Sequence, residues 1–431
     1  MEFPDATKID EVLGPPALPR FAEVRHEPET PELDDVAGAA RRALDALDLD
    51  SVPPGGTVAV GLGSRGIHDV VTVARVVVEE LDRRGFEPVV VPAMGSHGGA
   101  TAEGQRQTLA GLGLTEEALG CPIDASMETV VLGESAVGAD VHFARAALEA
   151  DGVLVINRVK AHTNFTGRFE SGLTKMATIG LGKQPGAKAT HEHALVDGYV
   201  PTIEASLDVI RERAPLLGGV AIVENFYDRT AEVTGIAAAD LPGAEAPLLE
   251  RADEYMPTLP FDDLDVLVVD RIGKDVSGAG MDTNVVGRYR VLNTDDPETP
   301  NIKRIVVRGL TEATHGNGNG IGLADVTTRA VADELDLSQV YANALTSSSL
   351  RKASVPVVMP DDRLAVAAGL STIGTYDPET VRVAWIRDTG HLSTFKISAA
   401  LVDDAPEDVT VGRWVDLGFE DGEATWTSAE E

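Results

Sequence analysis

The chain gathers its scarce lysines and histidines into one short stretch, residues 160–193. The whole sequence has nine lysines and nine histidines, and four of the lysines and three of the histidines lie in this stretch. Its basic residues are Lys160, His162, Arg168, Lys175, Lys183, Lys188, His191 and His193. Ammonium and guanidinium groups bind anions, and imidazole can transfer a proton or bind a metal near neutral pH. The stretch is therefore the first candidate for a functional site.

Within this stretch, Ser171, Gly172 and Lys175 open a helix-like segment. Backbone N–H groups at such a start, together with the helix dipole, bind anions. The later Gly182-Lys183 pair is not a Walker A motif, because Gln184 follows it. Lys183 and Lys188 could bind a phosphate or simply be solvated. His191 and His193 could bind a metal, with a solvated pair as the alternative.

A glycine-rich turn after the apolar run 57–62 carries two further polar candidates, Ser64 and Arg65. Such a turn can bind phosphate or carboxylate. It also has the G-x-G-x-x-G pattern of a dinucleotide fold. That fold needs an acid after the next strand to bind the ribose, and the segment 93–95 is Ala-Met-Gly instead. We interpret the turn as an anion site, with NAD binding or a plain tight turn as alternatives.

A second glycine-rich turn, after the apolar run 87–92, contains His97. Glycine allows a ligand to approach the backbone closely, and an imidazole at the end of a strand is well placed for proton transfer. The alternative is a histidine that is only hydrogen-bonded within its turn. Four other histidines lack such a setting and are expected on the surface or in packing, namely His26, His68, His142 and His391. The role of His315 stays open.

The elements that must position these groups are short, valine-rich apolar runs separated by helical stretches. The runs cover residues 57–62, 87–92, 152–157, 219–224, 264–270, 302–307 and 380–386. Continuous apolar strands of this kind are buried on both faces, and their alternation with helices predicts an α/β protein with largely parallel sheets. Residues 68–86 have helical spacing and end at Gly85.

The chain is expected to form two α/β domains, residues 1–262 and residues 263–431. Prolines and acidic residues near 255–263 mark the boundary. The second half opens with a glycine-rich loop that contains Lys274, a candidate for carboxylate or phosphate contact. Loops after strands in α/β proteins are common ligand sites, so the two halves are expected to face each other across an active-site cleft. The last residues are expected to pack back on the first domain.

Composition excludes several classes of function. The formal net charge is −34, spread along the chain, and so negative a surface repels nucleic acid and anionic membranes. An acidic surface poor in lysine is typical of proteins from a cytoplasm with molar salt, which predicts a halophilic, haloarchaeal source. Cys121 is the single cysteine, which excludes an internal disulfide and Cys-ligated zinc or iron–sulfur clusters. No run reaches the roughly 18 apolar residues of a membrane helix and the first residues lack a leader pattern, so a cytoplasmic protein is expected.

Taken in chain order, these residues resemble the nickel-pincer lactate racemase family. The family pattern is an arginine in a turn after the first strand, a glycine-flanked histidine after the second, then His…Phe-x-Gly…Ser-Gly-x-x-Lys and a later histidine. The matching residues here are Arg65, His97, His162, Phe165, Gly167, Ser171, Gly172, Lys175 and His191. The sharpest motifs lie at 61–105 and 157–193.

The resemblance implies a cofactor, a nickel complex of pyridinium-3-thioamide-5-thiocarboxylic acid mononucleotide, linked covalently to Lys175 and made by separate biosynthesis enzymes. It implies that His191 completes the coordination of nickel, in keeping with the ligand preferences of a borderline metal. His97 and His162 would act as acid and base on a 2-hydroxy acid, and Arg65 would hold the substrate carboxylate. Ser64, Ser171, Gly172, Lys183 and Lys274 are the further residues expected at the cofactor. Domain 1–262 would be the cofactor-binding domain.

The sequence also departs from the lactate enzymes. Position 62, where an acid is expected before Arg65, holds Leu62, and the stretch from His162 to Lys175 is about three residues longer. The loops at 273–288 and 314–328 resemble a racemase-related branch. The favoured function is thus a racemase or epimerase of an unspecified 2-hydroxy acid. The alternatives are an NAD-dependent oxidoreductase that uses the turn at 61–66, which lacks the ribose acid, and a non-catalytic protein that binds an anionic metabolite. The oligomeric state is not specified by these patterns.

Overall fold

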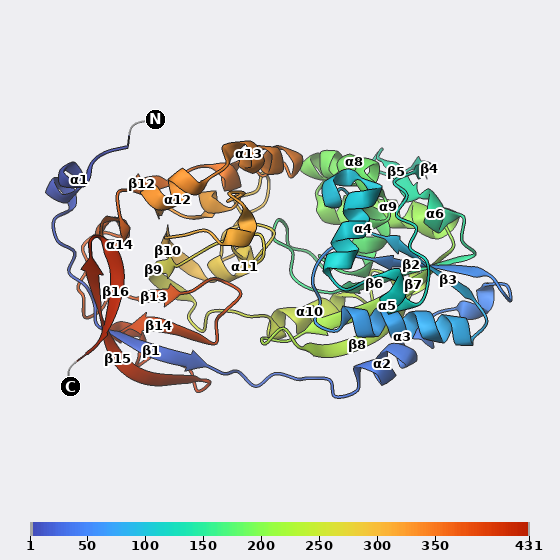
Figure 1. Cartoon of the computed structure of the whole chain (residues 1–431), viewed down its shortest axis with the longest axis horizontal. Coiled ribbons are helices and arrows are strands. Elements are labelled where there is room, and N and C mark those ends of the chain that lie inside the picture. The colour runs from blue at the N-terminus through green and yellow to red at the C-terminus, as the bar shows by residue number, and fades with distance from the viewer. Residues whose placement is uncertain (1–2, 430–431) are drawn as a thin grey trace. The chain divides into compact units, whose positions relative to one another are not determined.

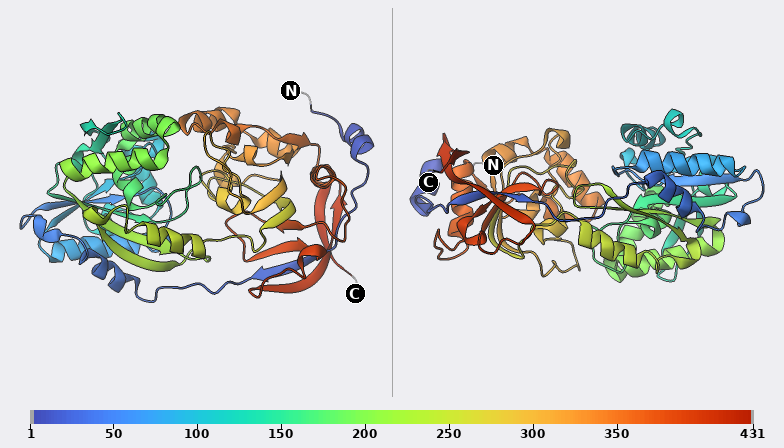
Figure 2. Two further views of the ribbon diagram at one scale, coloured as in Figure 1. Left: turned by 180° about the vertical axis from the view of Figure 1, so that it is seen from behind. Right: turned by 90° about the horizontal axis from the view of Figure 1, so that it is seen from below.

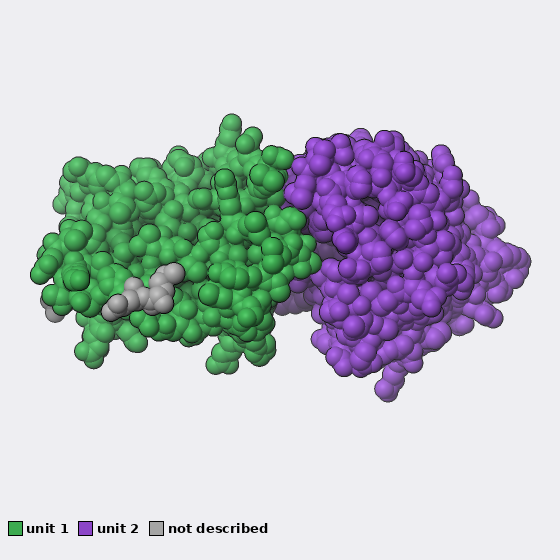
Figure 3. Space-filling view, turned by 90° about the horizontal axis from the view of Figure 1, so that it is seen from above, with its two compact units in different colours: residues 1–29, 257–431 green, residues 30–256 purple. Residues whose placement is uncertain are grey.

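The computed structural model describes residues 3–429, which divide into two compact units (Figure 3). Unit 2 covers Thr30–Met256, and unit 1 combines the N-terminal residues as far as Glu29 with the chain from Pro257 onward. The sequence grouped residues 1–262 together, whereas the structure places the N-terminal segment with the second half. The reason is strand pairing, since β1 (Phe21–His26) lies between β14 (Thr394–Ser398) and β15 (Val409–Glu420) and pairs antiparallel with both.

The sheet of unit 2 has five strands in the order β3-β2-β6-β7-β8 (Figure 1). Their bounds are β3 Glu87–Pro92, β2 Thr57–Leu62, β6 Gly152–Arg158, β7 Leu216–Glu224 and β8 Thr230–Ala237. The first four strands are parallel and β8 is antiparallel. The apolar runs of the sequence in this unit are therefore the four parallel strands, as expected for a sheet that helices cover on both faces.

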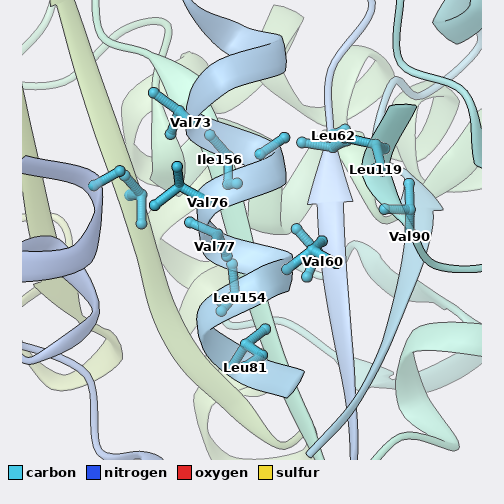
Figure 4. Packing of buried hydrophobic residues seen from close by; sticks show 14 of the residues in the cluster. Val60, Leu62, Val73, Val76, Val77, Leu81, Val90, Leu119, Leu154 and Ile156 are labelled. Atoms are coloured by element: carbon cyan, nitrogen blue, oxygen red, sulfur yellow. The ribbon is translucent and has the colours of Figure 1, made fainter. Parts of the chain in front are cut away.

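Helix α3 (Val70–Arg83) covers one face of this sheet and forms the centre of its core. Val73, Val77 and Leu81 of the helix are buried beside Leu154 and Ile156 of β6 (Figure 4). The helix ends at Arg83 with Arg84 as its C-cap, and Gly85 follows with a φ of 87°, a conformation that favours glycine. The sequence expectation of a helix in residues 68–86 is confirmed, with bounds shortened at both ends.

Other helices of unit 2 cover the opposite face or flank the carboxyl edge. Buried side chains of α9 (Tyr199–Arg213) and α10 (Ala246–Tyr255) pack with Ala59 of β2 and Val155 of β6 in one apolar cluster. The remaining helices of this unit that bear on the site are α4 (Ala102–Gly111), α7 (Leu173–Lys175) and α8 (Lys183–Asp197). Burial of these faces removes apolar surface from water and fixes the strand ends relative to one another.

The strand order in unit 2 determines where its polar loops meet. The chain places β3 on one side of β2 and then β6 on the other side, so the order reverses between β2 and β6. In open α/β sheets ligands bind outside the carboxyl ends of the strands at such a reversal. The loops that leave β2, β3 and β6 carry Arg65, His97 and His162, so the topology brings three predicted residues to one edge.

Unit 1 contains a nine-stranded sheet in the order β12-β11-β10-β9-β13-β14-β1-β15-β16 (Figures 1 and 2). The remaining bounds are β12 Val357–Met359, β11 Val326–Thr328, β10 Asn301–Val307, β9 Asp263–Val269, β13 Val383–Ile386 and β16 Glu423–Ser428. The first five strands are parallel and the last four pair antiparallel. Helix α14 (Asp362–Ser371) packs its buried side chains on the parallel part.

The predicted fold class, an α/β protein with largely parallel sheets in two parts, is confirmed. The sequence did not indicate the antiparallel extension of unit 1, because strands such as β15 alternate buried and exposed residues and lack a continuous apolar run. Within residues 3–429, no helix combines the length and the apolar character needed to span a membrane.

Candidate active site

Four of the predicted residues form one charged cluster at the carboxyl edge of the unit 2 sheet. Desolvation by the surrounding protein is the main cause that holds the pKa of His97 below its usual value. The charges of Arg65 and Lys175, together with His191, lower this pKa further. Arg65 likewise lowers the pKa of Lys175, and Lys175 lowers that of His191. Interactions of this kind require the groups to be close together. The structure therefore brings together residues that are up to 126 positions apart.

His97 lies in the glycine-rich turn between β3 and α4. Its side chain reaches solvent, but nearby protein atoms still desolvate it enough to favour the neutral ring. Ser64, in the turn after β2, places its Oγ 2.5 Å from Nδ1 of His97. Gly95 and Gly98 have φ values of 58° and 66°, and a Cβ on Gly98 would lie 2.6 Å from backbone carbon of the following helix. The turn thus needs glycine, and Ser64 orients the imidazole.

Lys175 ends α7 and is followed by a turn of π-helix, η3 (Met176–Gly180). π-Helical turns are rare and occur mostly at functional sites. Lys175 keeps partial access to solvent, while the protein atoms around its ammonium lower its pKa to about 7. Arg65 lowers the pKa further, and Glu170 opposes this shift. A substantial share of Lys175 is therefore an uncharged amine at neutral pH, which makes it a nucleophile.

His191 and His162 belong to one aromatic layer. Nδ1 of His191, in α8, lies 3.0 Å from the hydroxyl of Tyr199, the first residue of α9. The ring of Tyr199 stacks on Phe165 with centroids 4.7 Å apart, and Phe165 lies 4.6 Å from the ring of His162. Burial lowers the pKa of His191 to about 4, so its imidazole is neutral. When Nδ1–H donates to Tyr199, Nε2 is left as a metal-ligating lone pair.

Two buried glutamates support the cluster and were not foreseen from the sequence. Glu170 is 4% exposed and accepts hydrogen bonds from the backbone N–H of His162 (2.5 Å) and of Gly167 (2.9 Å). Burial raises its pKa to about 7. Glu170 directly precedes the predicted Ser171-Gly172 pair. This position next to the motif was the one sequence feature that could have indicated a role for Glu170 at the site.

The second glutamate, Glu245, explains the glycine of the motif. It is 1% exposed and accepts hydrogen bonds from the backbone N–H (3.0 Å) and Oγ1 (2.5 Å) of Thr174. A Cβ on Gly172 would lie 1.7 Å from Oε1 of Glu245, so no larger residue fits there. Gly172 is thus required for the backbone path that leads to Lys175, and Glu245 fixes that path from a distant part of the sequence.

A second guanidinium accompanies Arg65 at the reversal of the strand order. Desolvation lowers the pKa of Arg65, and the positive charge of Arg158, the last residue of β6, lowers it further. Arg158 forms a salt bridge with Glu224, the last residue of β7, and Glu224 also accepts a hydrogen bond from the backbone N–H of His68 (2.5 Å). Arg158 is thereby held in place beside Arg65. Two neighbouring arginines at this edge favour an anionic ligand.

The structure does not bring Lys183 into the cluster. Lys183 is fully buried, and its Nζ donates to the carbonyl of Pro92 (2.8 Å) and to Oε1 of Gln105 (3.1 Å). The predicted contact between Lys183 and the cofactor is therefore wrong for this conformation, because the ammonium is enclosed. Nε2 of Gln105 donates in turn to the carbonyls of Gly95 (2.9 Å) and His97 (3.3 Å). Lys183 thus braces the His97 turn.

The other candidates have ordinary settings in the structure. Ser171 pairs its backbone with Lys160 and closes the loop between them. Lys188 is exposed and lies 3.8 Å from Glu192. Nδ1 of His193 lies 2.9 Å from the carbonyl oxygen of Ala189. None of these contacts assigns a ligand.

Lys274 belongs to unit 1, and its Nζ donates to the carbonyl of Gly278 at 2.8 Å. Its predicted role at the cofactor stays a prediction. In the part of the chain that the structure describes, no group of three or more His, Cys, Asp or Glu side chains is arranged to hold a metal ion. A metal at the cluster would therefore take further donors from a cofactor.

Comparison with known proteins bears on the same segment. Residues 64–200 match the model of the lactate racemase N-terminal domain family, which confirms the resemblance over that part of the chain. The match spans Arg65, His97, Lys175 and His191. No curated protein matches the sequence. Among solved structures, the lactate racemase apoprotein from Thermoanaerobacterium thermosaccharolyticum is similar with a TM-score of 0.48 and 13% identity, over 85% of this chain and 88% of that chain.

Proposed function

We propose that the protein is a racemase or epimerase of 2-hydroxy acids that works with a nickel-pincer nucleotide held on Lys175. The observation that carries this proposal is the convergence of Arg65, His97, Lys175 and His191 at one sheet edge, within the segment that matches the lactate racemase N-terminal domain. An anion-binding arginine, a neutral imidazole, a nucleophilic amine and a metal-ligating imidazole are the groups this chemistry needs.

The residues present fit the cofactor. Lys175, with a pKa of about 7, has the uncharged amine that a covalent thioamide link requires. His191, with a pKa of about 4, is neutral and held by Tyr199, as a histidine ligand of nickel should be. Gly63 packs directly against Met176, the residue after Lys175, since a Cβ there would lie 2.9 Å from its Cε. When bound, the cofactor would supply a hydride acceptor.

The side chains of the protein have distinct tasks in this mechanism. Arg65, supported by Arg158, binds the substrate carboxylate and orients the reacting carbon. His97 accepts the proton of the substrate hydroxyl, which it can do because its ring is neutral at neutral pH. Ser64 fixes which nitrogen of His97 faces the substrate. His162, in the aromatic layer with Tyr199, is the second acid–base group and returns a proton during the reverse transfer.

The test is mass spectrometry of full-length protein produced together with the cofactor-building enzymes. We expect an adduct on the Lys175 peptide, with nickel in the intact protein. His97→Ala and His162→Ala should load normally but lose inversion, whereas Lys175→Ala should not load. An unmodified Lys175 in protein that retains NAD would contradict the proposal and favour an oxidoreductase.

A further inference from the structure

Unit 1 has its own reversal of strand order, between β9 and β13. After β9 the chain adds β10, β11 and β12 on one side, and it then returns to place β13 on the other side of β9. The carboxyl ends of parallel strands at such a reversal form the usual ligand site of an open α/β sheet. The loop that leaves β9 carries Arg271, and the loop that leaves β13 carries Arg387, Asp388 and His391.

Asp388 and His391 form a buried carboxylate–imidazole pair at this point. Asp388 is fully buried, and its Oδ1 accepts a hydrogen bond from the backbone N–H of Gly390 (3.1 Å) and lies 2.6 Å from Nδ1 of His391. The side chain of His391 is 57% exposed. The carboxylate therefore orients the ring through Nδ1, which leaves Nε2 directed away from Asp388. The expectation that His391 lies on the surface is confirmed, and the structure adds that its ring contacts the buried carboxylate of Asp388.

The same carboxylate gathers two guanidinium groups. Oδ2 of Asp388 lies 3.3 Å from Nε of Arg271 and 3.6 Å from Nε of Arg387. Both arginines meet Asp388 through Nε, so their terminal nitrogens can bind a further partner. One carboxylate faces two arginines and a histidine, which leaves a local surplus of positive charge. In a chain with a net charge of −34 this surplus is not a general property of the surface.

The carboxylate that directly follows β9, Asp270, has partners of its own. Asp270 accepts a hydrogen bond from Nη1 of Arg308 (2.5 Å) and from Nε1 of Trp385 (2.7 Å). Arg308 also pairs with Asp362 and lies over the ring of Trp385. Asp270 is thus held by Arg308 and Trp385 in a separate network. The terminal guanidinium nitrogens of Arg271 and Arg387 remain available as donors to an anion.

We propose that unit 1 binds a small oxyanion, a carboxylate or a phosphate group, through Arg271 and Arg387 beside His391, with Asp388 orienting all three side chains. Two guanidiniums offer planar, charge-assisted donors that match the oxygens of either group. The residues of this oxyanion site all belong to unit 1, so its existence does not depend on the racemase chemistry proposed for unit 2.

The experiment uses cofactor-free, full-length protein with isotope-labelled histidine, and NMR follows the ring resonances of His391. Inorganic phosphate and acetate are titrated separately at constant ionic strength, because salt screens exposed charges. We expect a saturable shift of the His391 resonances with at least one of the two probes, and the stronger probe identifies the ligand group. Arg271→Gln and Arg387→Gln should each weaken binding about tenfold.

Two matched controls locate the binding. Arg304→Gln removes a guanidinium of unit 1 that instead hydrogen-bonds Thr372, and it should leave the affinity unchanged. Arg65→Gln removes the anion-binding arginine of unit 2 and should leave the His391 titration unchanged. No saturable shift in the wild type, or a titration that survives Arg271→Gln but is lost in Arg65→Gln, would overturn the proposal. Circular dichroism of each variant establishes that the fold is retained.

Discussion

Oγ of Ser64 lies 2.5 Å from Nδ1 of His97, and the two residues reach this contact from the carboxyl ends of neighbouring parallel strands. The sequence assigned Ser64 to cofactor binding, whereas its observed partner is the candidate acid–base group. A hydroxyl can donate to or accept from Nδ1, so Ser64 determines which nitrogen of His97 carries the proton.

Ser64→Ala should lower kcat about fivefold to tenfold, because the loss of one hydrogen bond frees the imidazole to adopt other tautomers and orientations. Loading of Lys175 should be unchanged, since Ser64 contacts His97. Kinetics of the loaded variant give kcat, and NMR of labelled histidine gives the tautomer of His97. An unaltered tautomer ratio together with an unaltered kcat would show that the contact has no role in catalysis.

Attachment of the cofactor should depend on pH through Lys175. The ordinary pKa of 10.5 is lowered to about 7, and the deprotonated amine is the nucleophile. The initial rate of adduct formation should therefore rise as the pH increases through about 7 and level off above it. Mass spectrometry of samples taken at successive times measures this rate in apoprotein mixed with cofactor. A rate that still rises steeply above pH 9 would mean that Lys175 keeps an ordinary pKa.

Gln105→Leu should loosen the turn that carries His97. Lys183 can only donate, so Oε1 of Gln105 must face it, and the amide nitrogen then holds the carbonyls of Gly95 and His97. Loss of Gln105 leaves buried groups unpaired, and the free energy of unfolding should fall by about 2 kcal/mol. Hydrogen exchange should increase at residues 95–99.

The matched control is Gln107→Leu on the same helix, where the side chain is exposed and bonds only Glu103 among the described residues. Denaturant unfolding of this variant should differ from the wild type by less than about 0.5 kcal/mol. Equal destabilisation by the two substitutions would show that the Lys183–Gln105 contact does not stabilise the turn.

Glu170 should make stability fall as the pH rises. Its pKa is 4.5 in an ordinary setting and about 7 in the folded protein, so the folded state retains a proton that the unfolded chain releases between these values. The stabilisation is complete below pH 4.5 and is lost as the pH passes through about 7. In Glu170→Gln the side chain at this position does not titrate. The difference in free energy of unfolding between this variant and the wild type should therefore grow in favour of the variant, by about 3 kcal/mol at most, as the pH rises from 4.5 to above 7. Denaturant melts at several pH values measure the difference, and parallel pH curves for the two proteins would refute it.

The sequence could predict which residues meet in unit 2, because parallel strands align their carboxyl ends. Arg65 and His97 follow β2 and β3, and this rule alone places them together. The spacing of His191 and His193 indicated a possible metal site but not which histidine belongs to it, and the family resemblance pointed to His191. The buried position of Lys183 was not predictable, since a lysine after glycine in a basic stretch has the pattern of an anion ligand.

The long-range supports of the site could not be inferred from local patterns. Glu245 contacts the turn before Lys175 across 71 positions of sequence, and no spacing rule links the two. The pairing of β1 with β15 likewise joins the two ends of the chain. Asp388 and His391 are only three residues apart in the sequence. Their place beside a candidate ligand site follows from the reversal of strand order between β9 and β13, which only the sheet topology reveals.

The most direct test of the proposed chemistry is a chiral assay of the loaded protein in high salt with 2-hydroxy acids that carry deuterium on C2. Transfer of hydride to a bound acceptor and its return should invert the centre of a substrate while the deuterium stays on C2. A single enantiomer should therefore become a mixture of both, still labelled. Inversion with loss of the label to solvent, or no inversion of any hydroxy acid by protein whose Lys175 carries the adduct, would contradict racemisation by hydride transfer.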